Sequence, residues 1–270
     1  MNKKAAVITC NDVQKCIFNM LKEKGVSCES FDSLKLKDSI ENIKNYDTLV
    51  LPFPSDNLKF VFLPENSMLS DFLSKNQTVI GGMISNDIKS DLENAQINYI
   101  DYFENEAYVL KNAYLTSQGA LRLLLEKSKK YLPGSTALVC GFGRIGKSLA
   151  MMLKAIGLKV YITARSEKAV ADASSLGFDV LKISSLKSTL FYFDFIFNTI
   201  PSVIFSCKDV EHIRSDSIYF ELASSPYGAD AACFEYYEKN YVLASALPGK
   251  LYPEAVAKNI TEYILFSGGD

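Results

Sequence analysis

The apolar residues of this chain fall into short runs separated by polar or glycine-containing stretches, a pattern typical of alternating strands and helices. The clearest run, residues 137–140, leads directly into Gly141, Gly143 and Gly146. Apolar residues then recur at helical spacing over 149–156. These positions predict a buried strand, a tight glycine-rich turn and a helix that follows at once.

The same pattern recurs along the whole chain. Strands, with the polar ends that follow some of them, are predicted at 5–10, 26–31, 47–54, 78–82, 98–103, 159–164, 193–201, 217–226 and 241–250. Further helices are predicted between Asn11 and Gly25, from about Asn86, from Thr116 or Ser117 to Leu125, and from Pro253 to about Leu265. Residues 60–63 fit a strand and a packing loop equally well.

This alternation indicates an α/β chain with parallel sheets and right-handed crossovers. We expect two domains. Residues 1–115 form an N-terminal flavodoxin-like α/β domain that handles substrate or a partner, and the helix within 253–270 packs back to complete it. Residues 116–252 form a doubly wound Rossmann nucleotide-binding domain that includes the linking helix.

The composition excludes several classes of protein. The chain has 270 residues, of which 48% are hydrophobic and 22% charged, a composition typical of globular proteins. Its net charge of −2 provides no excess of positive charge that would attract nucleic acid or an anionic membrane. No apolar run reaches the ~18 residues of a membrane span. Six scattered cysteines without a C-x-x-C pair, and a single histidine, predict neither a metal site nor a disulfide framework, and they favour the reducing cytoplasm.

The glycine-rich turn has the G-x-G-x-x-G spacing of a dinucleotide site in its proper setting between a strand and a helix. The first glycine allows the turn, the second lets the backbone approach a pyrophosphate, and the third lets the helix pack closely on the strand. Amides at the helix start then face the phosphates. The predicted cofactor-binding residues of this loop are Gly141, Phe142, Gly143, Arg144, Ile145 and Gly146.

The end of the next strand predicts which cofactor binds. An NAD site carries Asp or Glu at this place to bind the ribose 2′-hydroxyl. Here Ala164 is followed by Arg165, Ser166 and, two residues on, Lys168. A guanidinium and a hydroxyl suit a 2′-phosphate, so we predict NADP(H) rather than NAD(H). The alternative is that Arg165 and Lys168 are solvated residues that open the next helix.

Three later strands end in polar residues, and ligands of doubly wound sheets bind outside the carboxyl ends of strands. Further cofactor contacts are predicted at Asn198, Thr199, Ile200, Pro201, Leu222, Ala223 and Ser224. Each of these residues could equally be a turn that ends its strand. His212 lies in a polar connection away from these ends, so a His–carboxylate acid–base pair is not expected.

From about Asn112 onward the chain resembles the A subunits of dipicolinate synthase. The resemblance rests on four motifs in order, at 141–146, 196–201, 221–226 and 247–250, the last followed by a proline. It implies NADP-linked oxidation of a dihydro- or hydroxytetrahydro-dipicolinate to dipicolinate, with a flavoprotein-like B subunit as partner. A homo-oligomer is also expected.

A dicarboxylate substrate requires cations or hydroxyl and amide donors. Lys250 and Asn198 are the candidate catalytic residues, Lys250 for a carboxylate and Asn198 for positioning a ring. The candidate substrate-binding residues are Thr116, Ser117, Ser225, Leu247, Pro248, Gly249 and Lys250.

Two alternatives stay open. One is another NADP-dependent dehydrogenase of a small acid, and the other is a non-catalytic nucleotide-binding scaffold or sensor. The second is kept open by the missing acid–base pair and by a departure from the family at 9–14, where Thr-Cys-Asn-Asp-Val-Gln replaces a glycine-rich segment with Asp and Arg. Further departures from the family occur at Gln118 and at 255–257.

Overall fold

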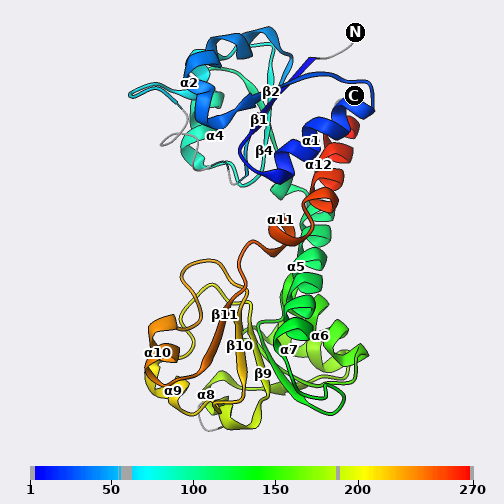
Figure 1. Ribbon diagram of the computed structural model, residues 1–270, viewed down its shortest axis with the longest axis vertical. Helices are drawn as coiled ribbons and strands as arrows, with labels where there is room; N and C mark the ends of the chain where they lie inside the picture. Colours follow the sequence, from blue (N-terminus) through cyan, green and yellow to red (C-terminus); the bar gives the residue numbers. More distant parts are fainter. Residues whose placement is uncertain (1–3, 54, 56–62, 187–188, 268–270) are drawn as a thin grey trace. The chain divides into compact units, whose positions relative to one another are not determined.

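The computed structural model describes residues 4–53, 55, 63–186 and 189–267. They form two compact units, one made of residues 1–111 and 252–270 and the other of residues 112–251. Each unit contains one parallel sheet with helices packed on it, so the chain is α/β with two domains (Figure 1).

The first unit holds a five-stranded sheet in the order β2-β1-β3-β4-β5. This is the flavodoxin-like order, in which the strand sequence reverses between β1 and β3. The strands are β1 (Lys4–Thr9), β2 (Ser27–Asp32), β3 (Thr48–Val50), β4 (Thr78–Gly81) and β5 (Asn98–Asp101). The helices are α1 (Asp12–Glu23), α2 (Leu36–Ser39) and α4 (Asn86–Asn94), with short 3₁₀ helices at Ser33–Lys35, Ile40–Asn45, Leu69–Phe72 and Tyr102–Glu104.

The C-terminal helix α12 (Pro253–Ser267) belongs to this first unit and packs along α1, as Figure 1 shows. Its buried face includes Val256, Ala257 and Ile260. The prediction that this helix completes the N-terminal domain is therefore confirmed. Of the undecided segment 60–63, Leu63 is buried in the core of this unit, and residues 60–62 lie outside the described part of the chain.

The second unit holds a six-stranded sheet in the order β11-β10-β9-β6-β7-β8, the doubly wound Rossmann order. Its strands are β6 (Thr136–Cys140), β7 (Lys159–Thr163), β8 (Asp179–Leu181), β9 (Phe195–Asn198), β10 (Ile218–Glu221) and β11 (Asn240–Leu243). Its helices are α6 (Arg144–Ala155), α7 (Glu167–Ser175), α8 (Ile183–Leu186), α9 (Cys207–Glu211), α10 (Ala231–Tyr236) and α11 (Leu247–Leu251), with a 3₁₀ helix at Leu190–Tyr192.

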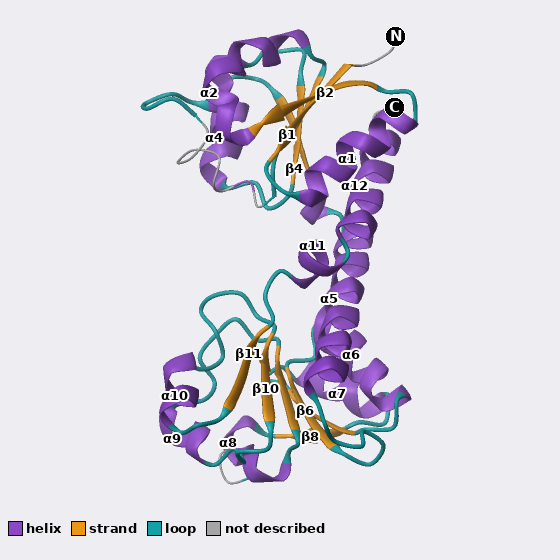
Figure 2. Ribbon diagram, in the orientation of Figure 1, coloured by secondary structure: helices purple, strands orange, loops and turns teal. Residues whose placement is uncertain are grey.

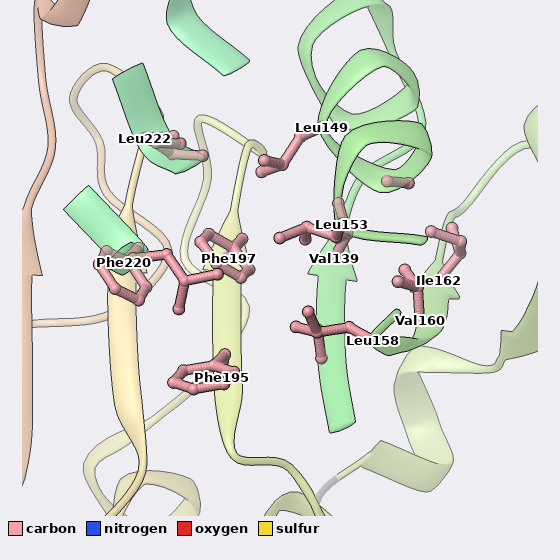
Figure 3. Close-up of a cluster of buried hydrophobic side chains, with 14 of the residues drawn as sticks. Val139, Leu149, Leu153, Leu158, Val160, Ile162, Phe195, Phe197, Phe220 and Leu222 are labelled. Atoms are coloured by element: carbon pink, nitrogen blue, oxygen red, sulfur yellow. The ribbon is translucent and has the colours of Figure 1, made fainter. Parts of the chain in front are cut away.

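Helices cover both faces of this second sheet (Figure 2). On one face the apolar side of α6, with Leu149 and Leu153, packs over Val139 of β6 and Phe197 of β9 (Figure 3). The other face packs against the segment of α8, α9 and α10. Both faces are thus buried, which explains why residues 137–140 of β6 and 195–197 of β9 are consecutive apolar residues instead of alternating with polar ones.

Helix α5 (Glu106–Lys127) corrects one prediction. The sequence pattern predicts a helix start at Thr116 or Ser117, but both residues lie in the middle of α5. Their hydroxyls donate to carbonyls four residues back, Thr116 to Asn112 at 2.9 Å and Ser117 to Ala113 at 3.0 Å. Such back-bonding lets Ser and Thr sit inside a helix, so their preference for caps misplaced the boundary.

A disulfide between Cys207 and Cys233 contradicts the prediction that cysteines do not pair. The two residues are 26 positions apart, and their Cα atoms lie 5.1 Å apart because α9 and α10 pack together. Spacing in the sequence gave no sign of this contact. The remaining cysteines, Cys10, Cys16, Cys28 and Cys140, are free.

Candidate functional site

The glycine loop after β6 has the geometry that its spacing predicts. Gly141 adopts a φ of +96°, which L side chains rarely adopt, and its amide donates to the Thr163 carbonyl at 2.8 Å. A Cβ atom at Gly141 would also lie 2.5 Å from Oγ1 of Thr199. The turn therefore requires glycine for both conformation and space.

The other two glycines differ from each other. Gly146, in the first turn of α6, leaves no room for a side chain, because a Cβ atom there would overlap the Gly141 carbonyl oxygen. Gly143 is the N-cap of α6, and a Cβ atom added there would meet no other part of the described structure within 4 Å. Close helix packing and an uncovered backbone at the helix start are what a pyrophosphate needs, so these residues fit a dinucleotide.

A cavity of about 420 Å³ opens beside this loop. It is lined by Gly141, Phe142, Gly143, Ala164, Arg165, Ser166, Lys168, Ala169, Asp172 and Ile200. The structure thus brings together the glycine loop, the end of β7 and the turn after β9. Sequence reasoning missed Ala169 and Asp172, which lie on the first two turns of α7. Helical spacing from Ser166 gives the signal that could have found them.

Arg165 is exposed at the end of β7, and its Nη2 donates to Oγ of Ser202 at 3.1 Å. Ser202 follows the turn after β9 and was also missed, because nothing in the sequence brings it to Arg165. Ser166 caps α7 by accepting a hydrogen bond from the Ala169 amide at 3.2 Å. The Ser166 hydroxyl thus serves as the N-cap of α7.

Asn198, at the end of β9, does not fit the catalytic role expected of it. Its side chain is completely buried. Its Nδ2 donates to the Ile200 carbonyl at 3.0 Å and to Oε1 of Glu221 at 2.7 Å, and its Oδ1 accepts from the Ile200 amide at 3.0 Å. Both amide protons are occupied, so Asn198 shapes the turn and has none left for a ligand.

Thr199 is similarly occupied, since its hydroxyl donates to the Cys140 carbonyl at 2.8 Å. Ile200 is half-buried in the cavity lining, and Pro201 is exposed. The contribution of this turn to the cavity is thus apolar surface and backbone.

Glu221, at the end of β10, is a buried acid that the site predicted from the sequence does not include. It is fully buried and accepts four hydrogen bonds, including one from Asn198. Burial raises the pKa of Glu221, although the four donors act in the opposite direction. An acid as the last residue of an otherwise apolar strand was the available signal. Beyond it, Leu222 and Ala223 are buried, whereas Ser224 and Ser225 are exposed.

The predicted substrate residues separate into two groups. Ser117 is fully buried and also donates to the Ile145 carbonyl at 3.1 Å, so it holds α5 against the start of α6. Thr116 is buried as well. Burial removes both from contact with a ligand. Residues 247–250, predicted as the end of a strand region at 241–250, belong instead to α11, which packs on α5 where Gly119 leaves room for Leu247.

Lys250 is exposed on α11 and forms no ion pair with any residue that the structure describes. His212 is exposed at the end of α9, where its Nδ1 contacts the Lys208 carbonyl. In the described ranges we find no group of three or more His, Cys, Asp or Glu side chains arranged to hold a metal. Within the same ranges no helix has the length and apolarity to cross a membrane.

Comparison with known proteins agrees with this geometry. Residues 95–204 match the family described as D-isomer specific 2-hydroxyacid dehydrogenase, NAD binding domain. The chain is 26% identical over 236 residues to the A subunit of dipicolinate synthase from Bacillus subtilis (strain 168), and the match covers 83% of this chain and 78% of the relative. The resemblance to the A subunits of dipicolinate synthase is confirmed.

Two solved structures share the fold. The crystal structure of the A subunit of dipicolinate synthase from Bacillus halodurans has a TM-score of 0.84 at 20% identity and covers 100% of this chain and 99% of that one. The corresponding dipicolinate synthase structure from Bacillus subtilis has a TM-score of 0.82 at 24% identity, covering 99% and 97%. The chain thus shares the fold of these two structures over nearly its whole length, and residues 95–204 within it match a family of NAD-binding domains.

Proposed function

We propose that this chain is the NADP-linked oxidoreductase component of a dipicolinate synthase. It would oxidise a dihydro- or hydroxytetrahydro-dipicolinate to dipicolinate together with a B subunit. The observation that carries the proposal is the similarity to the A subunit of dipicolinate synthase over 83% of the chain, which extends well beyond the nucleotide-binding half. The bound nicotinamide would supply hydride acceptance, and the chain's own residues supply binding and orientation.

The preference for NADP(H) rests on the end of β7. Arg165 lines the cavity with its guanidinium 3.1 Å from Ser202, and Lys168 lies in the first turn of α7. A 2′-phosphate placed here would meet two cations and the amino end of a helix, which favours anions. Asp172 lines the same cavity from the second turn of α7, so the cavity also holds one acid.

We assign binding of the dicarboxylate substrate to exposed hydrogen-bond donors that follow the carboxyl ends of β10 and β11. Ser224 and Ser225 follow β10, and Lys250 lies on α11. The exposed ammonium of Lys250 is the group that we assign to a substrate carboxylate. Leu247, Pro248 and Gly249 place that ammonium by forming the start of α11. We do not include Asn198, Thr116 and Ser117 in the proposed site, because these residues are buried and their polar side-chain atoms form hydrogen bonds within the chain.

A second candidate, a dehydrogenase of small 2-hydroxy acids, is favoured by the family match over residues 95–204. Its usual acid–base pair needs a histidine near the substrate. The single histidine of this chain, His212, lies at the end of α9 and not beside the glycine loop or the ends of β9 and β10. We therefore place this function second.

Calorimetric titration of the purified chain with NADPH and NADH, repeated with dipicolinate present, tests the proposal. Binding of NADPH that dipicolinate strengthens is the expected result, because a dicarboxylate pocket beside the nicotinamide couples the two ligands. Binding of NADPH that dipicolinate leaves unchanged argues for a nucleotide-binding scaffold or sensor. Strengthening by a 2-hydroxy acid instead of dipicolinate would favour the second candidate.

A further inference from the structure

Four hydrogen bonds converge on the buried carboxylate of Glu221. Its Oε1 accepts from Nδ2 of Asn198 at 2.7 Å and from the Ala223 amide at 3.1 Å. Its Oε2 accepts from the Gly228 amide at 2.8 Å and from the Tyr219 hydroxyl at 3.1 Å. The donors come from the end of β9, from β10 and from both ends of the loop that follows β10.

Three of these partners can only donate. The Ala223 and Gly228 amides have no acceptor atom to offer, and Asn198 has committed its oxygen to the Ile200 amide. A carboxylate is the side chain that accepts from all of them at once. A glutamine would set an N–H group against the amide of Ala223 or Gly228, and a buried unsatisfied donor is costly. A protonated acid could point its proton only at the Tyr219 hydroxyl, the one partner able to accept, and it would lose the stronger hydrogen bonds that a charged acceptor makes.

Gly228 extends the arrangement to the loop after β9. Its carbonyl oxygen accepts from the Ile204 amide at 2.8 Å and from the Phe205 amide at 3.0 Å. A Cβ atom at Gly228 would overlap Nδ2 of Asn198. The segment after β9, residues 199–205, and the loop after β10, residues 222–228, are thus joined through Glu221 and Gly228.

We infer that ionised Glu221 is a positioning residue that holds residues 199–205 and 222–228 as one rigid wall at the carboxyl ends of β9 and β10. The inference rests on the proposed function. In a doubly wound fold the half of the sheet formed by β9, β10 and β11 receives the nicotinamide half of the cofactor. Glu221 touches no ligand in this scheme, and it acts by fixing the wall against which the nicotinamide is held.

The titratable groups packed around Glu221 are Tyr219, Cys140 and Tyr241. Burial raises the pKa of all three, that of Tyr241 to about 12, so none of them changes charge in the acid range. Among the described residues no cationic side chain pairs with Glu221. Protonation of Glu221 therefore occurs above the pH at which an exposed glutamate titrates, because burial raises its pKa.

Hydrogen exchange compares the wild-type chain with E221Q. The control is E235Q, which removes an equal charge from an exposed position on α10. We expect E221Q to exchange at least about tenfold faster at residues 199–205 and 222–228, while α6 and β7 keep their protection. Unchanged exchange in both segments, or equal acceleration throughout the second unit, would overturn the inference.

Binding measurements with two ligands distinguish contacts to the two halves of the cofactor. NADP⁺ and 2′-phospho-ADP-ribose share the phosphate-binding contacts, but only NADP⁺ carries the nicotinamide. We expect E221Q to weaken the binding of NADP⁺ by about tenfold and to leave the binding of 2′-phospho-ADP-ribose unchanged. A tenfold loss of affinity is what losing one or two hydrogen bonds would cause. Equal weakening of both ligands, or of neither, contradicts the inference. If the wild-type chain binds neither ligand, the proposed function fails, and hydrogen exchange alone decides the role of Glu221.

A measurement on the unaltered chain covers the case in which E221Q does not fold. The affinity advantage of NADP⁺ over the fragment should shrink as the pH is lowered through the raised pKa of Glu221, because the neutral acid makes weaker hydrogen bonds than the carboxylate and requires the Tyr219 hydroxyl to change from donor to acceptor. An advantage that is constant until the chain unfolds would overturn the inference. In a folded E221Q variant the same profile should be flat.

Discussion

The three glycines of the turn after β6 are alike in sequence but differ in what a side chain would meet. The Gly141 carbonyl oxygen occupies the space that a side chain at Gly146 would need. A side chain at Gly143 would meet open space, and Gly143 has ordinary extended dihedral angles, with φ at −81°. Folding alone explains glycine at 141 and 146. It does not explain glycine at 143, where only an approaching ligand would exclude a side chain.

Paired alanine substitutions test this difference. G143A should fold with its stability within about ±0.5 kcal/mol of wild type, yet bind NADPH at least about tenfold more weakly, because a methyl group would occupy the path of the pyrophosphate. G146A should lose about 1–3 kcal/mol of unfolding free energy by overpacking. Chemical denaturation and calorimetric titration measure the two effects. Full NADPH affinity in G143A would refute the assignment of the phosphate site.

Arg165 determines the cofactor preference in our proposal. R165A should weaken the binding free energy of NADPH by roughly 1.5–3 kcal/mol, the usual contribution of a charge-assisted hydrogen bond, and change that of NADH much less. The control is R122A, which removes an arginine paired with Glu126 on α5. Parallel titrations with the two cofactors measure the difference. Equal weakening of both would exclude a 2′-phosphate contact at Arg165.

At the scale of elements, Asp194 joins the end of α5 to the starts of β6, β9 and β10. Its carboxylate accepts from Lys130 at 2.7 Å, Arg214 at 2.6 Å and the Thr136 amide at 2.8 Å. Burial acts to raise the pKa of Asp194, but these hydrogen bonds hold it well below its ordinary value. Lys130 also bonds Asp216 at 2.8 Å, so its ammonium is held between two carboxylates.

A substitution at this junction has a pH signature. D194N should lower the unfolding free energy by about 1–3 kcal/mol at neutral pH, since it removes a partly buried charged acceptor. Because the folded pKa is depressed, the contribution is present above the unfolded value of ~3.9 and is lost as pH falls through the folded value. Urea denaturation of both proteins should therefore converge toward strongly acid pH. A constant difference across the acid range would rule out the ionic origin.

At the scale of the whole molecule, the first unit is built from two distant parts of the chain. Residues 252–270 join residues 1–111, and α12 packs on α1 through a face that includes Ile260. The stability of the N-terminal sheet is thus coupled to the last helix of the sequence.

Truncating a buried side chain on α12 tests this coupling. I260A should lower the stability of the first unit by about 2–4 kcal/mol, the usual range for a buried cavity. K258A, on the exposed side of the same helix, is the control. Hydrogen exchange in α1 and β1 reports the loss residue by residue. Acceleration confined to α12 itself would show that the helix is dispensable for the first unit.

Local patterns determined much of this protein. The strand, the turn and the helix around Gly141 follow from contiguous residues, and so do the alternation of strands and helices and the position of Arg165 at the end of a strand. Such features depend on periodicity and backbone conformation, which neighbouring residues specify. The family resemblance likewise came from short motifs in order.

Only the tertiary structure decided which polar groups are free to act. Glu221 has its donors on segments from residue 198 to residue 228, the partner of Arg165 is 37 residues away, and Cys207 meets Cys233 across 26. The same packing buried Asn198 and Ser117, which sequence patterns had assigned to a ligand. Hydrogen-bond satisfaction and burial are properties of packing between distant segments, so no local pattern could have decided them.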